Sequence, residues 1–288
     1  MTADLRLERP ADVHAFEAVV GTFLTAREAE HNLMLGLVSG IRTGTWRDPY
    51  FAVVRRDERV VAAALRTPPY NLILSLVDDP EALPVLVEEV AATVPDLPGV
   101  VGQTEAARRF AELWRDRTGR GFRLKMAERV FRLAKVIPPR PTAGSLRRAT
   151  AGHRDLVIEW LRAFVLEALG PDEDVSDVAS FADRWLTGDG RWMYLWDDDG
   201  PVSMCGASGE TPNGIRVGPV YTPPELRGRG YASACVASVT QAQLDRGRRF
   251  CFLFTDLANP TSNKIYQAIG YEPVCDVDEY HFEARPAH

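Results

Sequence analysis

The chain has 288 residues, of which 45% are hydrophobic and 26% are charged. This composition is typical of globular proteins, and the length is sufficient for two ordinary domains. The net charge of -6 argues against nucleic acid as the main partner, because binding to a phosphate backbone requires a clustered positive face.

Nothing in the sequence indicates export, membrane insertion or metal binding. The amino terminus, MTADLRLERPADVH, carries charges from position 4 onward and lacks the apolar core of a signal peptide. The most apolar run, LMLGLV, is far shorter than the ~20 residues of a membrane-spanning helix. The histidines show no metal-ligand spacing, and the cysteines form no CxxC pair. We therefore expect a cytoplasmic protein with buried thiols, no metal and no membrane contact.

The first half of the sequence alternates between strand and helix patterns. In chain order we predict a strand and helix over 5–20, a helix over 26–40, a hairpin over 50–67, a strand over 71–77, a helix over 80–94, a strand over 99–103, a helix over 104–119 and a closing hairpin or long strand over 122–134.

The segment KVIPPRPTAGS, residues 135–145, is rich in proline and glycine and predicts a linker. We therefore expect one domain over 1–138, a linker over 139–145 and a second domain over 146–288.

The second half repeats the order of the first, which indicates a duplicated α+β unit. The predicted elements are a strand over 145–150, helices over 151–169 and 174–187, strands over 191–196, 202–210 and 215–222, a helix from Tyr231, a buried strand over 250–254, a helix over 260–270 and two terminal strands within 271–283.

The stretch RGRGYASA, residues 227–234, follows a predicted strand and opens a helix. It lacks the third glycine of a dinucleotide fingerprint and the lysine of a P-loop. Backbone N–H groups at a helix start with small side chains can still converge on an anion, and this arrangement suits a pyrophosphate. A tight turn that only requires Gly228 and Gly230 is the alternative at this stage.

Pro219 lies inside the predicted strand IRVGPVYT, where it cannot donate a ladder hydrogen bond. A bulge or splayed strand should result, and its freed backbone groups can pair with an extended ligand that bears amides. Asn259 leads the last predicted helix, and Tyr266 lies two turns along the same side.

These motifs resemble those of the GNAT acyltransferase superfamily. RGRGYA resembles the signature Arg/Gln-x-x-Gly-x-Gly/Ala, and NPTSNKIYQAIGY resembles the family's Asn-x-x-x-x-x-x-Tyr-x-x-x-Gly-aromatic helix. The likeness is specific over 190–283 and extends at the level of fold over 145–189. It implies two tandem GNAT-like domains, each a mixed, mostly antiparallel sheet flanked by helices. It also implies acetyl-coenzyme A as donor and an amine of a small molecule or peptide as acceptor.

The resemblance also implies roles for individual residues. Tyr266 would be the general acid that protonates the departing thiolate, and the Val220 N–H would stabilise the developing oxyanion. A half-buried tyrosine with its hydroxyl at the surface is the competing interpretation of Tyr266. The residues expected to bind the cofactor are Val220, Tyr221, Thr222, Arg227, Gly228, Arg229, Gly230, Tyr231, Ala232, Ser233, Asn259 and Ser262.

The sequence departs from the family in its general base, because IRVGPVYT contains no acid where many relatives have a glutamate. Glu210 and Asp256 are the nearest substitutes. A water chain, or an amine that arrives already neutral, is an equal alternative.

The first half lacks the features of a donor site. Its equivalent loop, SLVDDPEALP, has no glycine and carries Asp78, Asp79 and Glu81, which should repel a pyrophosphate. Arg117 stands where the tyrosine would be required. We expect a degenerate copy that supports the second half. A tandem acyltransferase similar to mycothiol synthases, and an acyl-coenzyme A sensor without turnover, are the alternative functions. The sequence leaves open whether the protein forms an oligomer.

Overall fold

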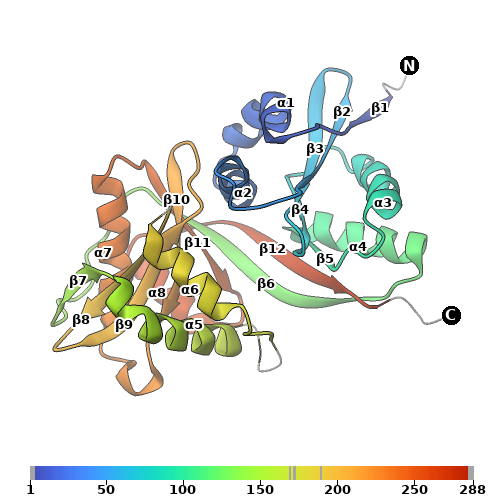
Figure 1. Cartoon of the computed structure of the whole chain (residues 1–288). Coiled ribbons are helices and arrows are strands. Elements are labelled where there is room, and N and C mark those ends of the chain that lie inside the picture. Colours follow the sequence, from blue (N-terminus) through green and yellow to red (C-terminus); the bar gives the residue numbers. More distant parts are fainter. Residues whose placement is uncertain (1–3, 169, 171–172, 189, 285–288) are drawn as a thin grey trace. The chain divides into compact units, whose positions relative to one another are not determined.

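The same order of elements, β-α-α-β-β-β-α-β-α-β, occurs twice along the chain (Figure 1). The structure is a computed structural model that describes residues 4–168, 170, 173–188 and 190–284. It divides into two compact units, Met1–Val130 with Val274–His288, and Phe131–Pro273.

The sheet of the first unit has the strand order β1-β2-β3-β4-β5-β12-β6. The pairs β1–β2, β2–β3, β3–β4 and β5–β12 are antiparallel, and the pair β4–β5 is parallel. The elements of this half are β1 Leu5–Glu8, α1 Val13–Ala26, α2 Asn32–Arg42, β2 Tyr50–Arg56, β3 Arg59–Arg66, β4 Leu72–Leu74, α3 Ala82–Thr93, β5 Gly99–Gln103, α4 Thr104–Thr118 and β6 Phe122–Leu133.

In the second unit the strand order is β6-β11-β10-β9-β8-β7. The pair of β10 and β11 is parallel, and β7 to β10 are antiparallel. The elements of this half are β7 Ser145–Arg148, α5 Arg154–Ala168, α6 Val178–Thr187, β8 Arg191–Asp197, β9 Pro201–Ser208, β10 Gly214–Tyr221, α7 Tyr231–Asp245, β11 Phe250–Asp256, α8 Pro260–Ala268 and β12 Glu272–Phe282.

The end of the chain differs from the prediction of two terminal strands. It forms one long strand, β12, whose residues Val277–His281 run antiparallel to β5. Tyr280 and Phe282 are buried in the first unit, where Phe282 stacks on Trp114 with ring centroids 5.2 Å apart. The strand therefore completes the first unit's sheet instead of folding back. For the same reason, the observed units differ from the expected division at residues 139–145.

Alternating strand residues build a core on both faces of each sheet. In β2, Ala52 and Val54 belong to the cluster beneath α3 and α4, whereas Phe51 and Val53 belong to the one beneath α1 and α2. The second unit is built in the same way, with α5 and α6 on one face and α7 and α8 on the other (Figure 1). No helix among the described residues is both long and apolar enough to cross a membrane.

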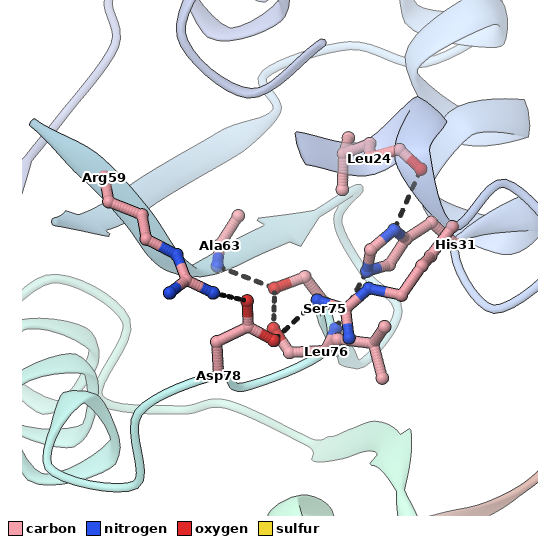
Figure 2. A network of polar contacts seen from close by, with 8 residues as sticks. Leu24, His31, Arg59, Ala63, Ser75, Leu76 and Asp78 are labelled. Carbon is pink, nitrogen blue, oxygen red and sulfur yellow. Dashed lines mark hydrogen bonds and ion pairs between the residues drawn. The ribbon is translucent and has the colours of Figure 1, made fainter. Parts of the chain in front are cut away.

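A buried histidine joins the helices of the first unit to the segment that follows β4 (Figure 2). The Leu76 N–H donates to His31 Nε2 at 3.0 Å, so the proton lies on Nδ1, which donates to the Leu24 carbonyl at 3.0 Å. Ser75 continues the network by accepting from the Ala63 N–H at 2.8 Å. Both ring nitrogens of His31 are thus used by the neutral form.

This geometry predicts a loss of stability in acid. Burial lowers the pKa of His31 from its ordinary value of 6.5, with the nearby Arg27 acting in the same direction and the Leu24 carbonyl, Glu30 and Asp78 opposing it. The unfolded chain binds the proton more readily than the folded chain. The contribution of neutral His31 to the free energy of unfolding is therefore complete above pH ~6.5, and it falls as the pH drops toward the pKa of His31 in the folded state. In urea unfolding, the free energy of unfolding of the wild type should fall between pH 7.5 and pH 5.5. The fall should be smaller by about 1 kcal/mol in His31→Gln.

The control is His14→Gln, which alters an exposed histidine on α1. It should leave the pH dependence of the unfolding free energy as in the wild type. An equal pH dependence in His31→Gln and the wild type would contradict the prediction.

Candidate functional site

The parallel strands β10 and β11 are paired over only the first part of their length. Gly214–Arg216 pairs with Phe250–Phe252, and the described residues show no further pairing between the two strands. On the other side of β10, the register with β9 shifts between Val217 and Val220. Pro219 lies within that shift and has no N–H to donate. The predicted bulge is therefore confirmed, and it frees the end of β10 from β11.

A glycine on the neighbouring strand makes room for this bulge. A Cβ atom at Gly206 would lie 2.7 Å from the carbonyl oxygen of Gly218 and 2.7 Å from the ring of Trp185. Gly218 itself has a φ of 134°, which disfavours other residues. Sequence reasoning missed Gly206, although a glycine inside a predicted strand is the signal for such a close approach.

The loop before α7 has the backbone conformation that its glycines predict. Gly228 and Gly230 have φ values of 77° and 87°, in the left-handed region. Gly230 is the N-cap of α7 and supplies no side-chain hydrogen bond to the helix. The first N–H groups of this helix, from Tyr231 to Ser233, therefore have no cap from that residue, and such groups attract anions.

The two arginines of the loop contact the protein itself. Arg227 Nε donates to the Thr222 carbonyl at 2.9 Å, and its Nη2 forms an ion pair with Glu167 at 2.6 Å. Arg229 donates to the Glu225 carbonyl at 3.3 Å. Contacts of both arginines with the protein itself thus help to shape the loop.

Two tyrosines of the expected cofactor set point their hydroxyls at carboxylates. Tyr221 is buried against Trp160 of α5, with ring centroids 6.2 Å apart, and its hydroxyl donates to Glu167 at 3.3 Å. The Tyr231 hydroxyl donates to Asp198 in the β8–β9 turn at 2.6 Å. The side chains of Tyr221 and Tyr231 thus fix the two ends of the segment 221–231, which contains most of the residues expected to bind the cofactor.

The start of α8 follows its sequence signature. Asn259 is the N-cap, and its side chain accepts from the Ser262 N–H at 3.0 Å. Tyr266 lies two turns along and is 9% exposed, packed against Tyr271. This burial argues against the interpretation of Tyr266 as a tyrosine with a surface hydroxyl.

The burial of Tyr266 also determines its protonation. Burial raises the pKa of Tyr266 well above its usual value, the neighbouring Cys205 raises it further, and the contact with Ser262 opposes the rise. The hydroxyl, which is already protonated at neutral pH at the ordinary tyrosine pKa of 10, therefore keeps its proton throughout the neutral range.

The two candidate bases lie at opposite ends of the sheet. Glu210 follows β9 beside the beginning of β10, where it forms an ion pair with Arg248. It is therefore remote from the end of β10, and the structure does not bring it to Tyr266. Asp256 ends β11 at the same edge as α8, but its carboxylate accepts from the Ala258 N–H at 2.7 Å in a turn.

Ion pairs hold the aspartates of the equivalent loop of the first unit, and Figure 2 shows the pair of Asp78 with Arg59. Asp78 pairs with Arg59 at 2.8 Å and also with Arg27, while Asp79 pairs with Arg56. Arg117, which replaces the tyrosine, pairs with Glu88 on α3. The carboxylates of this loop are thus paired with the protein's own arginines, and an arginine stands at the position that corresponds to Tyr266.

Comparisons with known proteins agree with this architecture. Residues 155–271 match the model of the acetyltransferase (GNAT) family. Among solved structures, a Drosophila protein is 13% identical, with a TM-score of 0.70 over 97% of this chain and 98% of that one. A GCN5-related N-acetyltransferase from Sphaerobacter thermophilus is 17% identical, with a TM-score of 0.60 over 97% and 95%.

A tandem GNAT protein from the clavulanic acid biosynthesis pathway is 16% identical, with a TM-score of 0.57 over 99% of this chain and 100% of that one. These likenesses confirm the expected α+β fold with two such units in tandem. No curated protein matches the sequence of the chain.

The close approach at Gly206 leads to a stability prediction. Gly206→Ala forces a methyl group against the backbone of the bulge, and overpacking of this kind costs about 1–3 kcal/mol. Gly152→Ala is the control, because its Cβ would meet only Thr150 Oγ1 at 3.8 Å. Guanidinium unfolding should show a lower free energy of unfolding for Gly206→Ala, and a change within about 0.5 kcal/mol for Gly152→Ala. Equal values would contradict the packing argument.

Proposed function

We propose that the protein is an N-acetyltransferase, on the premise that residues 155–271 match the model of the acetyltransferase (GNAT) family. It transfers the acetyl group of acetyl-coenzyme A to a primary amine of a small molecule or a peptide. The observation that carries the proposal is the parting of β10 from β11 beside the loop that begins α7.

The residues present fit the cofactor. The backbone of Val220–Thr222 lies beyond the last residues that β10 pairs with β11, so it can pair with the amides of an extended pantetheine arm. The N–H groups at the start of α7 suit the diphosphate. A Cβ at Gly228 would meet nothing within 4 Å, so this part of the loop stands in open space. Asn259 and Ser262, at the start of α8, are the remaining residues expected to contact the arm.

Acetyl-coenzyme A supplies an acetyl group activated as a thioester. The protein's part is to orient the donor and to provide a proton. Tyr266 is the proposed source of that proton, because its hydroxyl is protonated at neutral pH. The amine must lose a proton of its own, and Asp256 or water at the edge of the sheet is the candidate acceptor for it.

A first experiment tests the donor. Isothermal titration with acetyl-coenzyme A should give one site per chain, because the Asp78 and Asp79 loop closes the first unit with its own ion pairs. At 100 times the dissociation constant, the ligand should also stabilise the folded chain by about 2.7 kcal/mol. Absence of binding at millimolar concentration would contradict the proposed function, and two equal sites would contradict the closed first unit.

A second experiment tests the chemistry. Tyr266→Phe should lower kcat for thiol release at least about 10-fold across an amine panel, with little change in acetyl-coenzyme A affinity, because only the proton donor is lost. Tyr271→Phe is the matched control, since it removes a buried hydroxyl that contacts Thr240 on α7. It should lower stability and leave kcat intact. Binding without thiol release in the wild type would indicate a sensor instead of an enzyme.

A further inference from the structure

Glu167 joins three parts of the second unit that are distant in sequence. It lies in the last turn of α5, 60 residues before Arg227. Its Oε2 accepts from Arg227 Nη2 at 2.6 Å, and its Oε1 accepts from the Tyr221 hydroxyl at 3.3 Å. One carboxylate therefore holds the end of β10 and the beginning of the glycine loop at the same time.

The contacts of Arg227 extend this bridge to the backbone. Its Nε donates to the Thr222 carbonyl at 2.9 Å, and its guanidinium carbon lies 5.8 Å from the centre of the Tyr221 ring. Residues 222 and 227 are the two ends of the turn that contains the short helix Pro224–Leu226. The turn is thus closed by Arg227, and Arg227 is held in place by Glu167.

We propose that Glu167 is a positioning residue that fixes the turn between β10 and α7 in the conformation that binds the donor's diphosphate and the inner part of its arm. This inference rests on the proposed function. Glu167 acts through Arg227 and Tyr221, and it recognises no part of the donor directly.

The same contacts argue against a role for Glu167 as the general base. Each of its carboxylate oxygens accepts a hydrogen bond from the protein. Tyr221 is buried against α5 on the face of the sheet that α5 and α6 cover, whereas Tyr266 belongs to the cluster beneath α7 and α8. A base needs an oxygen that is open to the attacking amine.

The test separates donor binding from turnover. Glu167→Gln keeps the size of the side chain but loses its charge, so the ion pair with Arg227 is weakened. Titration with acetyl-coenzyme A should give an affinity about 5-fold weaker, the size expected for a half-exposed ion pair. The KM for acetyl-coenzyme A should rise to the same extent, while kcat and its pH profile remain those of the wild type.

Glu159→Gln is the matched control. It removes the same charge from an exposed position two turns earlier on α5, and it should leave affinity, KM and kcat unchanged. Arg227→Gln should weaken affinity at least as much as Glu167→Gln, and the double variant should be no weaker than Arg227→Gln alone, because both changes break one interaction. Tyr221→Phe keeps the packing with Trp160 and should weaken the affinity for acetyl-coenzyme A about 2-fold. This variant replaces Glu167→Gln in the test if Glu167→Gln folds poorly.

Each outcome is decisive. Wild-type affinity in Glu167→Gln, or additive losses in the double variant, would overturn the inference while the proposed function stands. A fall in kcat with loss of the acid limb of the pH profile would instead make Glu167 a general base. Failure of the wild type itself to bind acetyl-coenzyme A would remove the proposed function.

Discussion

Pro219 has no N–H to donate, and the regular hydrogen bonding of the second unit's sheet is interrupted at this residue. The register of β10 against β9 shifts across this residue, and the parallel ladder with β11 ends before it. Gly206 and Gly218 accept the bulge because neither carries a Cβ atom, which at Gly206 would strike the opposite backbone. A continuous ladder would leave no free backbone for a ligand between the strands, so the proposed donor site follows from this constraint.

The two units share one order of elements but differ in the loop that precedes α7 in the second unit and α3 in the first. In the second unit, the loop before α7 contains glycines with positive φ, and the N-cap residue Gly230 gives no side-chain hydrogen bond to the first N–H groups of the helix. In the first, aspartates occupy the equivalent loop and are neutralised by arginines from α1, β2, β3 and their flanks. The first unit nevertheless takes its strand β12 from the end of the chain. That strand follows α8, so the helix that carries Tyr266 is covalently continuous with the first unit's sheet.

Local features of this protein could be predicted from the sequence, and contacts between distant residues could not. The bulge at Pro219, the N-cap at Asn259 and the positive φ at Gly228 and Gly230 follow from the covalent properties of single residues. The single strand β12 was missed because the residues of β5 that it pairs with lie 174 to 182 positions earlier in the chain, and nothing in its own pattern specifies that pairing. Glu167 was missed for the same reason, since a glutamate near a helix end is ordinarily solvated.

The arginines of RGRG illustrate what such a motif contributes. The sequence analysis counts both among the residues expected to bind the cofactor, but Arg227 contacts Glu167 and Thr222, and Arg229 contacts the Glu225 carbonyl. The charge of Arg227 is paired with Glu167, whereas the exposed Arg229 contacts a neutral carbonyl oxygen and keeps its charge. Backbone N–H donors at the start of α7 are the other groups that an anion would meet. Such donors are fixed in direction by the helix and need no side-chain ordering when a ligand binds. In the proposed site, recognition of the diphosphate would therefore depend on the shape of the turn, which Glu167 and Arg227 help to keep.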